Sequence, residues 1–142
     1  RRLVLLHIVA RGKIGRSPEA ELTERYLKRI SWPTRMTELP DRGGSNPEAT
    51  TNNVNVVLDE RGKALTSMEF AKKLEGWRDT GRREARFWIG AADGHDQRIR
   101  DEADLLLSFG PATWPHMLVR AMLAEQLFRA TSILANHPYH RA

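Results

Sequence analysis

The C-terminal stretch of the chain reads Trp114-Pro-His-Met-Leu-Val-Arg-Ala-Met-Leu-Ala-Glu-Gln-Leu-Phe-Arg-Ala-Thr-Ser-Ile-Leu-Ala-Asn-His-Pro-Tyr-His-Arg-Ala142. Most of it has the pattern of one helix, because apolar residues recur at steps of three and four and share one stripe. The stripe consists of Leu118, Met122, Leu123, Leu127, Ala130, Ile133 and Leu134. Pro115 suits the first helical turn, and Pro138 forbids continuation of the helix. Donor groups and rings crowd the terminus after that stop, which predicts a tail that docks somewhere.

Strand and helix patterns alternate along the rest of the chain. Residues 3–10 are apolar except for His7, which is typical of a strand buried on both faces of a parallel sheet. Helix starts are indicated by Ser17 followed by proline and by the capping-box sequence Thr66-Ser-Met-Glu69. The expected strands are 3–10, 35–39, 54–58, 85–89 and 105–109, and the expected helices before the C-terminal one are 18–32, 67–77 and 96–103. This alternation predicts an α/β fold, with a mostly parallel sheet flanked by helices, in a single domain over residues 1–142.

Loops rich in glycine, proline and small polar residues separate these elements. They are expected over 41–53, at a turn around Gly62, at a turn over 90–94 and over 110–114. Three loops are candidate ligand sites: the one after Leu58, the one over 90–94 and the one over 109–114. Each follows a predicted strand, and ligands bind beyond the carboxyl ends of the strands in open parallel sheets. Neither GxGxxG nor GxxxxGK[ST] occurs, so dinucleotide or nucleoside-triphosphate binding of those kinds is not supported. The residues alone leave two interpretations open, because Gly90 also suits a strand-ending turn, and Phe109 and Trp114 also suit a core.

Composition narrows the class of partner. The 142 residues carry a net charge of +5 and a sequence pI near 10.1, which favours anionic partners and nucleic acid first. Arginines cluster at Arg78, Arg82, Arg83 and Arg86, and guanidinium groups suit phosphate oxygens. The absence of cysteine excludes disulfides, thiol catalysis and thiolate metal sites, and favours a cytoplasmic protein. No segment is long and apolar enough for a membrane span, and no signal peptide is expected.

The C-terminal runs carry a resemblance to a known family. His116-Met-Leu-Val-Arg120, Ala124-Glu-Gln-Leu-Phe-Arg-Ala130 and above all Asn136-His-Pro-Tyr-His-Arg141 resemble the C-terminus of the RlmH family. These are small bacterial SPOUT-class methyltransferases that act on a pseudouridine of large-subunit ribosomal RNA. The resemblance implies a SPOUT fold with a C-terminal deep trefoil knot, a homodimer, S-adenosylmethionine as methyl donor and 23S ribosomal RNA in the assembled ribosome as substrate.

The resemblance also implies which residues bind the cofactor, mostly through backbone groups in the knot. The matching positions are Leu58, Gly90, Phe109, Gly110, Pro111, Ala112, Thr113 and Trp114. Two positions depart from the family pattern. Ala91 stands where relatives usually have a second glycine, and His95 stands where they usually have leucine. Both departures put the contacts of this loop in doubt without removing Gly90 and Gly94.

Methylation at N3 of pseudouridine requires an imide proton to leave, and donors near the flanking oxygens stabilise the resulting negative charge. The resemblance places the tail at the site, so we expect Tyr139 and Arg141 to position the base and stabilise charge. His116 is expected to make a polar contact at the entrance, with helix capping as its structural alternative. His140 is a less favoured candidate base. Two further arginines, Arg120 and Arg129, suit either a buried ion pair or an RNA contact.

Three other functions were weighed. A non-catalytic RNA-binding module would explain the basic charge, but not the histidine-rich tail or the glycine turns after strands. A metal site built from His116, His137 and His140 lacks a cysteine or a nearby acidic ligand, so we expect no metal. A hydrolase is not supported, because the chain has no GxSxG nucleophile motif.

Overall fold

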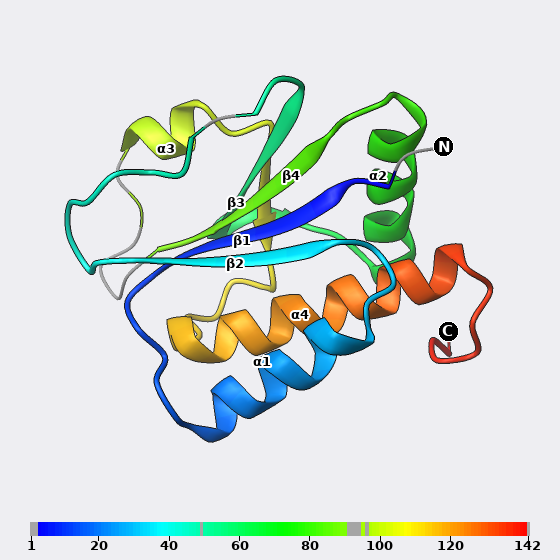
Figure 1. Ribbon diagram of the computed structural model, residues 1–142, viewed down its shortest axis with the longest axis horizontal. Coiled ribbons are helices and arrows are strands. Elements are labelled where there is room, and N and C mark those ends of the chain that lie inside the picture. The colour runs from blue at the N-terminus through cyan, green and yellow to red at the C-terminus, as the bar shows by residue number, and fades with distance from the viewer. Residues whose placement is uncertain (1–2, 49, 91–94, 96, 142) are drawn as a thin grey trace.

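The computed structural model describes residues 3–48, 50–90, 95 and 97–141. Five strands form one sheet in the order β2-β1-β4-β3-β5, with parallel neighbours throughout (Figure 1). The strands are β1 (Leu5–Arg11), β2 (Thr34–Leu39), β3 (Asn53–Ala64), β4 (Glu84–Ile89) and β5 (Leu105–Ser108). The helices are α1 (Pro18–Arg29), α2 (Ser67–Asp79), α3 (Gln97–Asp101) and α4 (His116–Leu134). The predicted α/β architecture is confirmed.

The capping residues read from the sequence begin two of these helices. Ser17 accepts a hydrogen bond from the backbone N–H of Ala20 at 3.1 Å, at the start of α1. Thr66 and Glu69 form a reciprocal capping box at the start of α2, with distances of 3.1 and 2.8 Å. Both caps satisfy backbone donors that the first helical turn leaves without an intrahelical partner.

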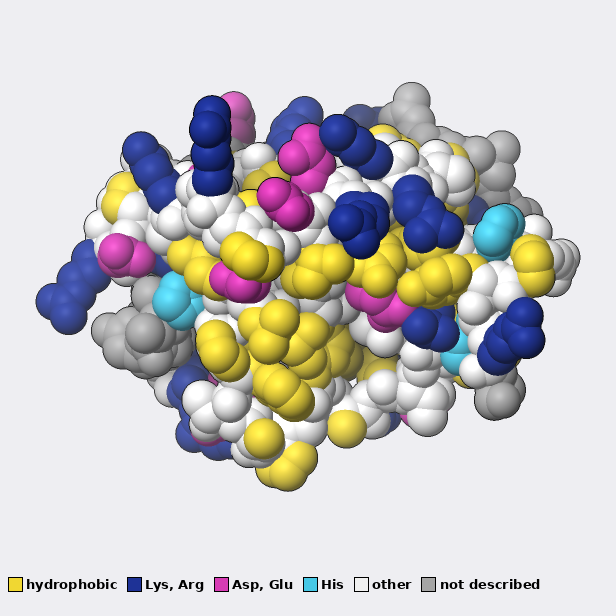
Figure 2. All heavy atoms as spheres, turned by 90° about the horizontal axis from the view of Figure 1, so that it is seen from below, with side chains coloured by type: hydrophobic (Ala, Val, Ile, Leu, Met, Phe, Trp, Pro, Cys, Tyr) yellow, Lys and Arg dark blue, Asp and Glu magenta, His cyan; other side chains and the backbone are white. Residues whose placement is uncertain are grey.

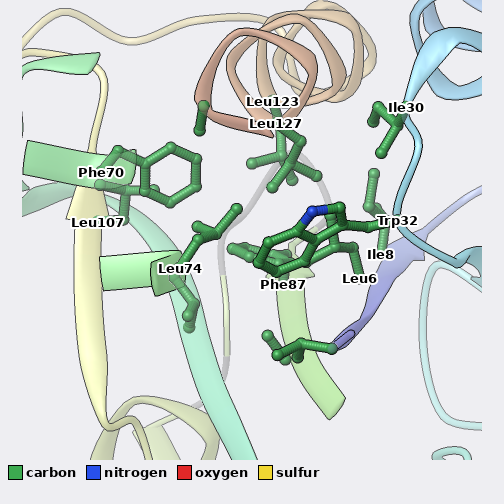
Figure 3. Close-up of a cluster of buried hydrophobic side chains, with 14 of the residues drawn as sticks. Leu6, Ile8, Ile30, Trp32, Phe70, Leu74, Phe87, Leu107, Leu123 and Leu127 are labelled. Carbon is green, nitrogen blue, oxygen red and sulfur yellow. The ribbon is translucent and has the colours of Figure 1, made fainter. Parts of the chain in front are cut away.

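The main core lies between the sheet and the three longer helices. Residues of β1, β3, β4, β5, α2 and α4 form one buried apolar cluster, and α1 packs against α4 (Figure 1). Figure 3 shows Leu74 of α2 and Leu123 and Leu127 of α4 converging with Phe87 of β4 and with Trp32. A buried leucine or phenylalanine contributes roughly 1.5–3 kcal/mol, so this cluster fixes α4 against the sheet.

The second face of the sheet carries a small apolar cluster and a buried polar network. Glu84 accepts from His7 and, at 3.0 Å, from Arg86, and all three side chains are almost fully buried. Arg86 also donates to the carbonyl oxygens of Pro47, at 2.9 Å, and Glu48. The expectation that Arg86 joins a phosphate-binding arginine cluster is therefore wrong, because its guanidinium group ties the segment before β3 to the sheet.

The expected turn around Gly62 is also wrong. β3 continues through it to Ala64, with a register shift against β5 between Leu58 and Lys63. A Cβ atom at Gly62 would lie 2.7 Å from the carbonyl oxygen of Leu106, closer than any side chain tolerates. Glycine stands here because the two strands approach each other closely, as at other strand glycines.

α4 begins and ends differently from the prediction. Pro115 is the N-cap residue and lies before the first turn. The helix stops at Leu134, where Asn136 adopts a left-handed φ of 59° and His137 N–H donates to Ser132 O at 2.8 Å. This is a Schellman arrangement, so the left-handed Asn136 terminates the helix before Pro138 is reached.

Candidate active site at the carboxyl ends of the strands

A cavity of about 410 Å³ opens where β4 and β5 end, beside residues 58–61 of β3. It unites residues that lie far apart in the sequence, because the carboxyl ends of parallel strands share one edge of the sheet. The predicted site residues that line it are Leu58, Gly90, Phe109, Gly110, Ala112, Thr113, Trp114 and His116. Pro111 belongs to the same loop but is exposed and is absent from the lining.

Hydrogen bonds fix the loop after β5 against β3. The Ser108 hydroxyl accepts from the N–H of Gly110 at 2.9 Å and lies 3.1 Å from the carbonyl oxygen of Glu60. Thr113 donates to the Glu60 carboxylate at 2.8 Å. Trp114 is 43% exposed, so a large aromatic surface faces solvent beside the cavity. The loop therefore presents backbone groups and an aromatic ring to a ligand from a fixed position.

Asp59 adds an ionised carboxylate to the cavity wall. Its side chain is 5% exposed, its Oδ1 accepts from the N–H of Arg61 at 2.8 Å, and Arg100 Nε lies 2.9 Å from its Oδ2. Burial works to raise the pKa of Asp59, but the hydrogen bond from Arg61 and the charge of Arg100 outweigh it and lower the pKa. Asp59 was not among the site residues expected from the sequence, although its place directly after the predicted strand 54–58 was a signal.

His95 also lines the cavity, with its Nε2 3.1 Å from the carbonyl oxygen of Leu58. The histidine that replaces the usual leucine thus contacts the end of β3. The other departure from the family pattern, Ala91, lies outside the described residues, as does Gly94.

The entrance histidine does not cap its helix. His116 is the first residue of α4, and the N-cap residue Pro115 makes no side-chain capping hydrogen bond. His116 is partly buried and lines the cavity. Its position agrees with the predicted polar contact rather than with the capping alternative.

The tail residues lie at the opposite end of α4. The helix has 19 residues, which at a rise of 1.5 Å per residue gives a length of about 28 Å. Tyr139, His140 and Arg141 follow that end and do not line the cavity. One chain therefore brings His116 to the cavity but leaves the other three predicted catalytic residues remote from it.

The tail nevertheless docks, as predicted, and it folds back along the second half of α4 as far as Glu125. Tyr139 donates to Glu125 Oε2 at 2.9 Å, and its ring meets the ring of Phe128 edge-on with centroids 4.5 Å apart. Arg129 pairs with Glu125 at 2.5 Å and donates to His140 Nδ1 at 3.1 Å. Glu125 was not among the site residues expected from the sequence, and with Arg129 it forms the surface on which the tail docks.

These contacts set the charge states of the tail. Burial, followed by the neighbouring Glu125 and Tyr26, raises the pKa of Tyr139 to about 12. The hydrogen bond to Glu125 raises the pKa of Arg129. Tyr139 is therefore a neutral donor at physiological pH. Arg141 is exposed, so its guanidinium group is accessible from solvent.

Arg120 belongs to the structure of the fold. Its side chain is completely buried and pairs with Glu38 at 2.5 Å. The alternative of an RNA contact for Arg120 is excluded by this burial. For Arg129, the ion-pair alternative is the one that the structure displays.

Two negative observations concern only the described part of the chain. No group of three potential ligands among the described residues could hold a metal ion, and His116 lies at the other end of α4 from His137 and His140. No described helix is long and apolar enough to cross a membrane.

The chain matches known proteins over almost its whole length. Residues 4–140 match the family described as predicted SPOUT methyltransferase. The chain is 69% identical to a ribosomal RNA large subunit methyltransferase H from Rhizorhabdus wittichii, over 97% of this chain and 99% of that protein. It is 68% identical to the protein of the same name from Novosphingobium aromaticivorans, with the same coverage of both chains.

A solved structure agrees at the level of the fold. A probable methylase family protein from Haemophilus influenzae Rd KW20 superimposes with a TM-score of 0.60 at 13% identity, over 92% of this chain and 66% of that one. The matches in sequence, the parallel sheet and the cavity at its carboxyl edge together define the class of protein. The chain belongs to the SPOUT methyltransferases and, within them, to the RlmH family.

Proposed function

We propose that the protein transfers a methyl group from S-adenosylmethionine to N3 of a pseudouridine in 23S ribosomal RNA. The observation that carries the proposal is the cavity, which unites the residues that the family resemblance assigns to the cofactor, Pro111 excepted. The substrate follows from the names of the relatives, which are large-subunit ribosomal RNA methyltransferases. The assembled ribosome in the cytoplasm is the proposed setting, and residues 1–142 are proposed to form one methyltransferase domain.

The cavity suits a ligand with the chemistry of S-adenosylmethionine. Its volume of about 410 Å³ falls among cavities that hold small molecules. Phe109 and Trp114 offer aromatic surface for an adenine ring, and the backbone of Gly90 and Gly110 is open to close approach. Asp59 supplies a carboxylate for donor groups of the ligand. When bound there, S-adenosylmethionine supplies an electrophilic methyl group.

We propose that a second copy of the chain completes the site. The predicted catalytic tail and the cavity lie at opposite ends of α4, so one chain does not unite them. Figure 2 views the molecule from the side of α1 and α4 and shows hydrophobic side chains gathered on that surface. Leu118 and Met122 of the predicted stripe remain partly exposed on α4. A homodimer that covers this surface could bring the tail of one chain to the cavity of its partner.

The four predicted catalytic residues then have distinct proposed roles. Tyr139 stays neutral, and its hydroxyl proton, which Glu125 accepts in the single chain, turns to a carbonyl oxygen of the base when the RNA is bound. Arg141 is exposed and can stabilise the negative charge left when the N3 proton departs. His116 contacts the base at the entrance. His140 is the candidate acceptor of the proton, which it takes at Nδ1 once that atom leaves Arg129. Alignment of base and methyl group supplies much of the remaining rate, on the order of several kcal/mol.

A methyl-transfer assay tests this proposal. Labelled S-adenosylmethionine is incubated with ribosomes that lack the modification, and the labelled nucleoside is identified after digestion. We expect label on a pseudouridine N3 with the parent, and a loss of at least about tenfold in kcat for Tyr139→Phe and Arg141→Ala, because each removes one charge-stabilising donor.

The exposed Arg25→Ala on α1 provides a matched control with parental activity, since Arg25 makes no ion pair among the described residues. Cofactor binding without methyl transfer to any ribosomal RNA would contradict the proposal that ribosomal RNA is the substrate. Failure to bind the cofactor at all would favour the RNA-binding module.

A further inference from the structure

The loop between β1 and α1 lies beside the entrance of the cavity. Gly12 of this loop is buried, and a Cβ atom placed there would lie 4.0 Å from His116 Nε2 and 3.3 Å from Met117 Cε. His116 itself lines the cavity. Residues 12–16 therefore continue the rim of the proposed active site away from the cofactor loops.

Buried groups hold this loop in place. Arg120 donates to the carbonyl oxygens of Gly12, at 2.6 Å, and Arg11, at 3.1 Å. The same side chain pairs with Glu38, which in turn accepts from the N–H of Ile14 at 2.9 Å. The fully buried guanidinium group of Arg120 thus donates hydrogen bonds to backbone carbonyl oxygens of the loop and holds the loop in place. Its own charge is balanced by Glu38.

The loop after β2 is tied to the same place. Arg11 donates to the carbonyl oxygens of Pro40, at 3.0 Å, and Gly43. Asp41 Oδ1 would lie 3.0 Å from a Cβ atom at Gly12, so the two loops are in contact. Arg42 stands between these contacts and is exposed.

The surface formed by residues 12–16 and Arg42, here called the rim surface, has a surplus of positive charge. Lys13, Arg16 and Arg42 are exposed, and none forms an ion pair with another described residue. Two acidic residues lie nearby, Glu38 and Asp41. The charge of Glu38 is neutralised by Arg120, so Asp41 is the one that offsets the positive charge of the rim surface. The acidic residues in the first turn of α1 are matched by the positive end of the helix dipole.

We propose that the rim surface binds the phosphate backbone of the RNA substrate next to the nucleotide that enters the cavity. This inference rests on the proposed function, because it names the surface that positions the RNA of that reaction. Phosphate contacts fix the register of a nucleic acid without reading its sequence. A braced backbone with exposed cations at its tip suits that task, and the adjacent His116 lies between this surface and the cavity.

Two triple variants with the same change in net charge test the proposal. The first combines Lys13→Gln, Arg16→Gln and Arg42→Gln. The control combines Lys72→Gln and Lys73→Gln on α2 with Arg35→Gln at the amino end of β2, where all three residues are exposed. Binding to unmodified large ribosomal subunits and to protein-free 23S RNA is measured over a series of salt concentrations, with cofactor binding and thermal stability as checks on folding.

We expect the rim variant to bind both RNAs at least about tenfold more weakly at low salt, and its salt dependence to flatten by about two in the log–log slope, as for two or three lost phosphate contacts. Cofactor binding should match the parent, and the control should keep the parental slope. Equal slopes in the two triple variants would overturn the proposal. A loss on subunits alone, with binding to protein-free RNA intact, would also overturn it, because the partner would then be a ribosomal protein. A parent that binds cofactor but methylates no RNA would instead refute the proposed function.

Discussion

His7 is a buried ionisable residue in the middle of a strand, and its protonation is linked to folding. Burial lowers the pKa of His7, although Glu84 opposes the shift. Burial also acts against the charged form of Glu84, but hydrogen bonds from Thr50, His7 and Arg86 lower the pKa of that carboxylate. The favoured state has a neutral His7 and an ionised Glu84 beside a charged Arg86. His7 Nε2 lies 2.7 Å from Thr37 Oγ1, so both ring nitrogens have partners.

This linkage predicts an acid-sensitive fold. An unfolded chain binds a proton at His7 more readily than the folded one, so stability is present above the unfolded pKa of about 6.5 and is lost as pH falls toward the lower folded value. The free energy of unfolding, measured by denaturant at constant protein concentration, should fall between about pH 7 and 5.5. His7→Gln should be less stable at pH 7 and lose this slope. An unchanged slope in the variant would show that other groups cause it.

Among the secondary-structure elements, β3 shows most clearly where sequence patterns mislead. Its first half was predicted from its apolar residues, but Gly62 was interpreted as a turn. Glycine marks both turns and close approaches of backbone, and only the partner strand distinguishes them. The same limit applies to α4, whose end was assigned to Pro138 although Asn136 ends the helix first. Local signals identified the elements and misplaced two of their ends.

The close approach at Gly62 gives a prediction for β3. Gly62→Ala should force β3 away from the backbone of Leu106 and lower the free energy of unfolding by roughly 1–3 kcal/mol, as overpacking does. Because β3 and the loop after β5 share the cavity wall, cofactor affinity should fall too. Calorimetric unfolding and cofactor titration measure both effects.

Gly76→Ala is the control for this substitution. Gly76 lies in α2 with open space around it, so alanine should stabilise the protein by roughly 0.5–1 kcal/mol. A Gly62→Ala protein as stable as the parent would contradict the close packing of the two strands.

For the molecule as a whole, the sequence predicted the sheet, the loops at its edge and a docked tail. The sequence pattern predicted the parallel arrangement of the strands. The family resemblance assigned the cofactor-binding residues, and all of them except Pro111 line one cavity. Neither source placed Asp59 in the wall or buried Arg120 behind the rim, because burial of a charge depends on contacts between distant segments. The resemblance alone suggested a homodimer with the tail at the site.

The central claim is that the active site combines the cavity of one chain with the tail of its partner. The most direct measurement is the methyltransferase activity of a heterodimer, isolated with two tags, in which one chain carries Gly110→Val and the other Tyr139→Phe. Gly110 has a φ of 107°, so valine disrupts the cavity loop. If sites form between chains, each variant homodimer keeps at most about a tenth of the parental activity. The heterodimer then keeps one intact site, with about half the parental activity. Activity no higher than that of the two variant homodimers would contradict a shared site.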